Sequence, residues 1–249
     1  MSQEEQKRAS RRQLLKSVPL AASASLLAAA ARGAEPTPGD AEGPFYPIVD
    51  NDMTFVGRLG RPAFFGNRAA SASGEDPTRA KGDVIYVYGT VTDTEGKPVP
   101  DVLVDIWQAD HQGIYAHSGD PRSGERDPNL QANGHSVTDD AGRYCFKTIK
   151  PKWYGQETFM RTPHIHFRVN RRGYRELTTQ MYFAGEELNA KDGLYNQHSP
   201  AEQALLTVDL APVDSLDAEL AEMMQKEFYE KALVAGARQG RFDIVIETV

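Results

Sequence analysis

The feature that most restricts the fold of this chain is a series of strand-like runs separated by turns that contain glycine or proline. Residues 84–93 read VIYVYGTVTD and residues 102–110 read VLVDIWQAD, with the turn-forming TEGKPVP between them. Both runs are rich in β-branched and aromatic residues, which fit the pleated surface of a sheet. In the second run Val102, Val104 and Ile106 recur at every other position, as expected of a strand with two unlike faces.

The same form recurs along the rest of the chain. Residues 135–151 read as a strand, an Asp-Ala-Gly turn and a second strand, and residues 164–183 read as a hairpin about Arg172-Gly173. LLTVDLAPV and RFDIVIETV supply further strands, and only residues 216–236 show strong helical spacing of apolar residues. Many short strands with such turns predict an all-β fold, a β-sandwich with long loops and one helix in the C-terminal half.

The sequence before the first strand predicts two segments of different kinds. Residues 35–83 are rich in Pro, Gly, Asn and Asp, so we expect an extended arm and loops there, followed by a sandwich core over residues 84–249. Residues 1–34 have a charged start, a short apolar run and an alanine-rich end, which are the features of a signal peptide. An ordinary amphipathic N-terminal helix is the alternative.

The leader also predicts an export route. Arg11 and Arg12 in ASRRQLLKS form the pair that is typical of a twin-arginine signal. The apolar run that follows is too short to cross a bilayer comfortably, so we expect no stable membrane span after the signal is removed. The protein is therefore expected to be exported, to the periplasm or outside the cell. Because this route carries folded proteins, it favours a bound metal that is inserted before export.

Charge and cysteine content exclude some functions. The formal net charge is −7, so sequence-independent binding to nucleic acid is not expected. With the single cysteine Cys145, the chain can form neither an internal disulfide nor a cysteine-based zinc cluster. Since Cys145 lies in the apolar run RYCFKTI, we interpret it as a small core residue and not as a catalytic thiol.

The stretch RTPHIHF, residues 161–167, is the first candidate for a site. In a strand, His164 and His166 share one face while Ile165 and Phe167 share the other. As neutral rings, the two imidazoles can direct nitrogen atoms at one metal ion. The alternative is a half-buried hairpin strand on which two polar side chains face water.

Two tyrosines lie where strands end. Tyr115 occupies a glycine-containing turn in WQADHQGIYAH, and Tyr154 follows a proline in TIKPKWYG. Either tyrosine alone would be interpreted as a core or surface ring with a hydrogen-bonded hydroxyl group. The order Tyr–Tyr–His–His along the chain is more specific than any one of its members.

With these residues in view, the sequence resembles the intradiol ring-cleavage dioxygenases, the family of catechol 1,2-dioxygenase and protocatechuate 3,4-dioxygenase. The resemblance runs from AEGPFYP to the C-terminus and is carried by GTVTDTEGKPVPDVLVDIWQADHQGIYAH, TDDAGRYCFKTIKPKWY, RTPHIHF and TTQMYF. It implies a non-haem enzyme with one Fe(III) per chain. Such an enzyme cleaves a small aromatic diol between its two hydroxylated carbons with O₂, giving a cis,cis-muconate-type product.

The resemblance also implies a ligand set, namely Tyr115, Tyr154, His164 and His166. It implies that Tyr154 is the axial ligand that departs when substrate binds and that Tyr115 is the equatorial ligand that is retained, with His164 equatorial and His166 axial. The chemistry of these groups agrees, because ferric iron suits anionic oxygen and also accepts imidazole. A free tyrosine has a pKa of about 10, so it needs a strong cation to ionise at neutral pH. Two phenolates and a hydroxide would cancel the charge of the ion, as a buried site requires.

Two further residues gain a role from the resemblance. Arg161 alone would be interpreted as a solvated charge, but the resemblance implies that it stabilises negative charge on the substrate ring. The resemblance also implies that Gln180 is a hydrogen-bond partner near substrate or oxygen. Protocatechuate-type members have Pro and Trp after the second tyrosine, whereas here Gly155 and Gln156 follow it and Trp153 precedes it. That departure affects the ring pocket and not the iron ligands.

Two other functions fit parts of the sequence. A zinc or ferrous enzyme could combine the two histidines with a third, drawn from His111, His117, His135 or His198. A non-catalytic, transthyretin-like binding module resembles residues 84–107 only. Residues 35–83 look too loop-like for the helical dimerisation domain of catechol 1,2-dioxygenases, so the sequence leaves homo-oligomer formation open.

Overall fold

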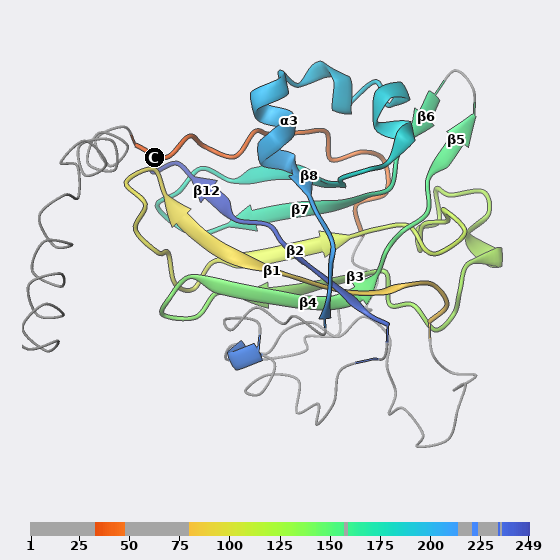
Figure 1. Cartoon of the computed structure of the whole chain (residues 1–249), viewed down its shortest axis with the longest axis horizontal. Helices are drawn as coiled ribbons and strands as arrows, with labels where there is room; N and C mark the ends of the chain where they lie inside the picture. Colours follow the sequence, from red (N-terminus) through yellow and green to blue (C-terminus); the bar gives the residue numbers. More distant parts are fainter. Residues whose placement is uncertain (1–32, 48–79, 157–158, 214–220, 224–233, 235) are drawn as a thin grey trace, which may run out of the picture. The chain divides into compact units, whose positions relative to one another are not determined.

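Two five-stranded sheets and a two-stranded hairpin make up the structure, a computed structural model (Figure 1). It describes residues 33–47, 80–156, 159–213, 221–223, 234 and 236–249. Residues 35–249 form one compact unit. The architecture confirms the prediction of an all-β, sandwich-like fold with few helices.

The first sheet is organised around its longest strand, β1. This strand pairs antiparallel with β4 and parallel with β11 and β12, and β11 in turn pairs with β10. The bounds of these strands are Val84–Asp93 (β1), Arg143–Ile149 (β4), Ala211–Pro212 (β10), Arg238–Arg241 (β11) and Ile244–Ile246 (β12). Residues 84–93 therefore form the strand that their pattern predicts.

The second sheet has the order β3-β2-β7-β8-β9 and carries the two histidines near its middle. Strand β7 pairs antiparallel with β2 on one side and with β8 on the other. The strands are Leu103–Trp107 (β2), Asn133–Val137 (β3), His164–Asn170 (β7), Leu177–Phe183 (β8) and Thr207–Val208 (β9). The β7–β8 hairpin turns at residues 171–173, which confirms that prediction.

A shared hydrophobic core joins the two sheets. It includes Val87 from β1, Phe146 from β4, Val104 from β2, and Ile165 and Phe167 from β7, each fully buried. Burial of this much apolar surface is the main favourable term in folding. On β7 the core takes every second side chain, so the intervening histidines point to the opposite face of the sheet.

Several short elements were not predicted from the sequence. Strands β5 (Tyr154–Gln156) and β6 (Phe159–Arg161) form a small hairpin, and α3 (Pro200–Leu206) begins with a capping box at Ser199. Three 3₁₀ turns are η1 (Ser123–Glu125), η2 (Glu187–Lys191) and η3 (Tyr195–Gln197). Of residues 216–236, where a helix was predicted, the structure describes 221–223, which are helical, and 234 and 236, which are not.

The arm, which we define as residues 35–47, has no regular secondary structure and is tied to the rest of the molecule (Figure 1). The Thr37 N–H donates to Val245 O at 3.1 Å, and the Asp40 N–H donates to Thr178 O at 2.9 Å. Residues 1–32 of the predicted leader (1–34) and residues 48–79 lie outside the described part, so the predicted segment boundaries stay predictions. No helix among the described residues is long and apolar enough to cross a bilayer.

Candidate metal centre

Strand β7 delivers both histidines to a buried position. His164 and His166 are each only 2% exposed, so the alternative in which they face water is wrong. In the ladder, His166 lies opposite Trp107 of β2 and opposite Gln180 of β8. The Trp107 indole stacks on the His166 ring with centroids 4.7 Å apart, which fixes the orientation of that imidazole.

Tyr115 reaches the histidines from the loop that follows β2. A bridge pairs Tyr115 with Ala109, and the Tyr115 N–H donates to Asp120 Oδ2 at 2.9 Å. The Tyr115 ring is buried and stacks on Phe45 of the arm, with centroids 4.7 Å apart. The loop thus holds the phenol both through its backbone and through its ring.

Tyr154, the first residue of β5, is held beside Tyr115 by a close backbone approach. Gly113 has φ +78°, and a Cβ added there would lie 2.5 Å from Trp153 O and 3.1 Å from Tyr154 Cβ. Only glycine fits this contact between the two tyrosine-bearing segments. The Tyr154 ring meets the Tyr115 ring edge-on at 5.5 Å and lies 5.8 Å from the His164 ring.

Three ligand-type atoms converge at one point. Tyr115 Oη lies 3.2 Å from His164 Nε2 and 3.1 Å from His166 Nε2, and the two nitrogens are 3.2 Å apart. His164 Nδ1 donates to Thr162 O at 2.6 Å, so its proton is on Nδ1 and its Nε2 carries a lone pair. An imidazole held this way by a backbone carbonyl is the usual arrangement of a metal-ligating histidine.

The electrostatics of the cluster suit a cation. Burial lowers the pKa of His164 to about 3 and, with the nearby His164 and Arg161, lowers that of His166 well below its usual value. Burial and the proximity of Tyr154 raise the pKa of Tyr115, while burial, partly offset by Arg161, raises that of Tyr154. The set is therefore neutral by itself, and a highly charged ion is what would ionise the phenols. Two imidazoles and two phenols of which three are buried fit ferric iron.

Arg161, at the end of β6, is buried and not solvated. Its side chain is 3% exposed, and its Nε donates to Asp192 Oδ2 at 3.0 Å. Asp192 is fully buried and also accepts from the Thr162 N–H at 2.9 Å. Burial disfavours the charged guanidinium, but Asp192 and the neighbouring Tyr154 and Tyr182 outweigh it, so the pKa of Arg161 is raised.

Gln180 links Arg161 to the arm. Its Oε1 accepts from Arg161 Nη2, and its Nε2 donates to Ala41 O at 2.7 Å. The Tyr182 hydroxyl lies 3.3 Å from Gln180 Oε1 and donates to Asp40 Oδ2 at 2.6 Å. A continuous polar chain therefore runs from the arm to the guanidinium beside the ligand cluster.

Four residues around the site were not predicted from the sequence. Asp192 and Asp40 lie in loops without a recognisable pattern, and Asp120 resembles any turn aspartate. Tyr182 was quoted within TTQMYF but was given no role. Acidic residues are common in loops, and the site residues that Asp40 and Asp192 contact are distant in the sequence. Their roles could therefore not be predicted from a local pattern.

The remaining histidines do not complete a different site. Within the described residues, which include all six histidines, no three His, Cys, Asp or Glu side chains are grouped as metal ligands. His111 lies 3.9 Å from Asp127, and His198 lies 3.2 Å from Asp40. This arrangement does not support the zinc or ferrous alternative with a third histidine.

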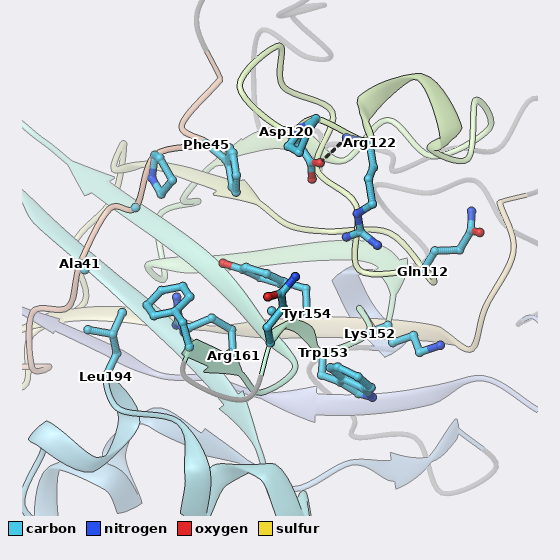
Figure 2. Close-up of a pocket in the computed structure, with 16 residues that line it drawn as sticks. Ala41, Phe45, Gln112, Asp120, Arg122, Lys152, Trp153, Tyr154, Arg161 and Leu194 are labelled. Atoms are coloured by element: carbon cyan, nitrogen blue, oxygen red, sulfur yellow. Dashed lines mark hydrogen bonds between the residues drawn. The ribbon is translucent and has the colours of Figure 1, made fainter.

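A cavity of about 820 Å³ opens beside the ligand cluster (Figure 2). It is lined by Arg161 and Tyr154, by other residues of the β5–β6 hairpin, and by Ala41, Gly43, Pro44 and Phe45 of the arm. A concave, largely preformed pocket with a few convergent polar groups is the usual place for a small-molecule substrate. The remaining lining residues are Gln112, Asp120, Pro121, Arg122, Lys152, Trp153, Gly155, Gln156, Phe159 and Leu194.

Comparison with known proteins identifies the family of this chain. A family model described as a dioxygenase matches residues 61–224. This chain belongs to the intradiol dioxygenase family. The match extends far beyond residues 84–107, so it overturns the alternative of a transthyretin-like binding module.

Curated relatives of this chain include several dioxygenases. The protocatechuate 3,4-dioxygenase beta chain of Burkholderia cepacia is 43% identical over 119 residues, which are 46% of this chain and 50% of that protein. Catechol 1,2-dioxygenase of Acinetobacter baylyi is 33% identical over 173 residues, 64% of this chain and 50% of the other. The chain thus spans about half the length of these curated relatives.

Solved structures agree with the fold of this chain. Catechol 1,2-dioxygenase from Acinetobacter sp. ADP1, inhibited by bound mercury, aligns with a TM-score of 0.59 and 26% identity, covering 92% of this chain and 68% of that one. The dioxygenase domain of a dioxygenase carbohydrate-binding protein fusion from Streptomyces sp. SirexAA-E aligns with a TM-score of 0.54 and 25% identity. That match covers 86% of this chain and 100% of that one.

Proposed function

We propose that this chain binds one Fe(III) and cleaves a catechol-type aromatic between its two hydroxylated carbons, using O₂. The observation that carries the proposal is the convergence of Tyr115 Oη and two histidine Nε2 atoms within 3.1–3.2 Å of one another beside a pocket. Tyr154 completes the proposed ligand set from the rim of the same pocket. The named relatives support the reaction class.

When bound, ferric iron would supply the Lewis acidity that holds a diol and the redox chemistry that O₂ requires. The protein would supply the geometry. His164 and His166 bind as neutral rings, because burial lowers their pKa values. Tyr115 is held through both its backbone and its ring and is suited to remain a ligand throughout. Tyr154, only half-buried and facing the pocket, is suited to receive a proton at its Oη from the entering diol.

Arg161 and Gln180 would act on the substrate ring. The guanidinium lines the pocket and is fixed by Asp192 and Gln180, so it can stabilise negative charge without first reorganising. Phe45, stacked on Tyr115, covers the cluster from the arm and helps to exclude water. These assignments retain every residue that the sequence analysis proposed for the site.

Metal analysis and oxygen uptake test the proposal together. Protein loaded with iron should hold about one ferric ion per chain, absorb visible light through ferric–phenolate bonds, and consume O₂ when given a catechol. Zinc-loaded protein is the matched control and should be colourless and inactive. Active protein that contains zinc and no iron would refute the assignment of the metal.

We further propose that residues 1–34 direct export by the twin-arginine route and that residues 84–249 form the catalytic core. The paired Arg11 and Arg12 before a short apolar run support the first part. Replacing both arginines by lysine should leave the precursor in the cytoplasm. Unchanged export of that double variant would point to another route.

A further inference from the structure

The cavity beside the ligand cluster is much larger than a simple diol requires. Its volume of about 820 Å³ falls within the roughly 300–1,000 Å³ of pockets that enclose drug-sized ligands. A catechol has only a single six-membered ring with two hydroxyl groups. One end of the cavity is buried, at Arg161, and the other reaches solvent at exposed residues of β5 and β6. Much of the space therefore lies beyond the ring.

The outer part of this cavity presents aromatic surface. Trp153 is 41% exposed and Phe159 is 60% exposed, and both line the cavity. Single exposed apolar side chains are ordinary on protein surfaces. Two large aromatic side chains that line one cavity are more informative, because such groupings mark places where ligands bind. Flat faces of this kind favour a flat, conjugated substituent.

The same outer part carries unneutralised positive charge. Arg122 and Lys152 line the cavity and, within the described part of the chain, neither side chain forms an ion pair. Arg122 Nη2 donates to Gly113 O at 2.7 Å, which holds the guanidinium in place while leaving other donors available. Figure 2 shows these two residues, with Gln112 and Trp153, toward one side of the view, opposite Ala41 and Leu194.

Acidic side chains offset only part of the positive charge that lines the cavity. Among the described residues that line the cavity, Asp120 is the only acidic one, and both of its carboxylate oxygens accept from backbone N–H groups, those of Tyr115 and Arg122. At the buried end, Asp192 already pairs with Arg161. In a chain with formal net charge −7, a cavity with two unpaired cations at its outer part selects for an anion.

We propose that the substrate is a catechol with a flat, conjugated substituent that ends in a carboxylate. The diol would lie at the ligand cluster, the substituent between Trp153 and Phe159, and the carboxylate at Arg122 and Lys152. This inference rests on the proposed function for the diol end only. It differs from a carboxylate attached directly to the ring, because the cations lie at the outer part of the cavity.

Paired substrates test the proposal. Iron-loaded protein is given 3,4-dihydroxycinnamate and its methyl ester, which differ in charge but hardly in shape, and the ratio of their kcat/KM values is measured. The acid should be preferred by about tenfold or more, the effect of one charge-assisted contact. In the variant Arg122→Gln/Lys152→Gln the ratio should fall to about one. Lys97→Gln, which removes an exposed charge in the turn after β1, should leave the ratio unchanged.

A wild-type ratio near one would overturn the proposal, and so would a high ratio that survives the double substitution. A binding measurement that needs no turnover distinguishes failure of this inference from failure of the proposed function. Calorimetric titration of the full chain with 4-hydroxycinnamate and its methyl ester needs no ring cleavage, because neither ligand is a diol. Tighter binding of the acid, lost in the double variant, supports the anion site even if no catechol is cleaved. Equal affinities, or no measurable binding of the acid, contradict it even if catechols are cleaved.

Discussion

Tyr115 and Tyr154 have different surroundings, although both are proposed ligands. Tyr115 is 2% exposed and its oxygen contacts both histidine nitrogens, whereas Tyr154 lies at the pocket. We expect Tyr115→Phe to lose most of its iron. Loss of a residue that only supports a ligand lowers metal affinity about 10–100-fold, and loss of the ligand itself should lower it further. Tyr154→Phe should keep more iron but bind catechol more slowly. Metal content and stopped-flow spectra measure both effects, and identical behaviour of the two variants would contradict the division of roles.

Arg161 is expected to matter more for turnover than for iron. Removing one well-aimed charge-stabilising donor commonly lowers the rate by about 10²–10³-fold, so Arg161→Ala should lower kcat by that order at unchanged iron content. The same change leaves Asp192 buried and unpaired, which should reduce stability. Arg161→Lys keeps a cation for Asp192 and is the matched control for stability. A normal kcat in Arg161→Ala would exclude a role at the substrate.

The raised pKa of Asp105 predicts how the stability of the fold depends on pH. Burial raises its pKa to about 6 and Arg168 only partly offsets this, and Asp105 Oδ1 has no hydrogen-bond partner. Between about pH 4 and pH 6 the native state therefore holds more protons than the unfolded state, so stability falls as the pH rises. Asp105→Asn removes this loss and should add about 1–2 kcal/mol at pH 8 but nothing at pH 4. Thermal denaturation at both pH values measures the difference. The exposed Asp209→Asn is the control, and equal gains at both pH values would contradict the account.

At the scale of elements, the arm acts as a part of the site. Asp40 accepts from the Tyr182 hydroxyl and lies 3.2 Å from His198, and Tyr182 in turn contacts Gln180. Asp40→Ala should cost about 1–3 kcal/mol, because it leaves buried polar groups without a partner. By loosening Gln180 it should also lower kcat severalfold while iron content stays constant.

Glu42→Ala, on the exposed side of the same arm, is the control for this variant. Melting temperature, kcat and metal content are measured for both proteins. If Asp40→Ala behaved like Glu42→Ala, the arm would be a surface attachment and not a support for the site.

Elements with strong local patterns were predictable, and those held by distant contacts were not. The β7–β8 hairpin has alternating apolar residues and an Arg-Gly turn, so its sequence alone indicated it. Strands β5 and β6 have three residues each, too few for an alternating pattern, and they exist because they pair with each other. The capping box at Ser199 was a readable signal for α3 that the sequence analysis did not use.

At the scale of the whole molecule, the site joins segments that are distant in the sequence. Tyr115 and His164 are separated by 49 positions, and the Gln180–Ala41 bond spans 139. The four proposed ligands were recognised through their order and the family resemblance, not through any local pattern. Burial of Arg161, its partner Asp192 and the size of the cavity depend on packing across the fold, so only the structure could reveal them.

The central claim is that this protein opens a catechol ring between its two hydroxylated carbons. The most direct test is mass spectrometry of the product formed by iron-loaded protein from a catechol under ¹⁸O₂. We predict a cis,cis-muconate-type dicarboxylate that carries one labelled oxygen in each new carboxylate, because both atoms of one O₂ are incorporated. A yellow semialdehyde would show cleavage outside the diol, and an unlabelled product would show that O₂ is not the oxygen donor. Either result would contradict the proposed function.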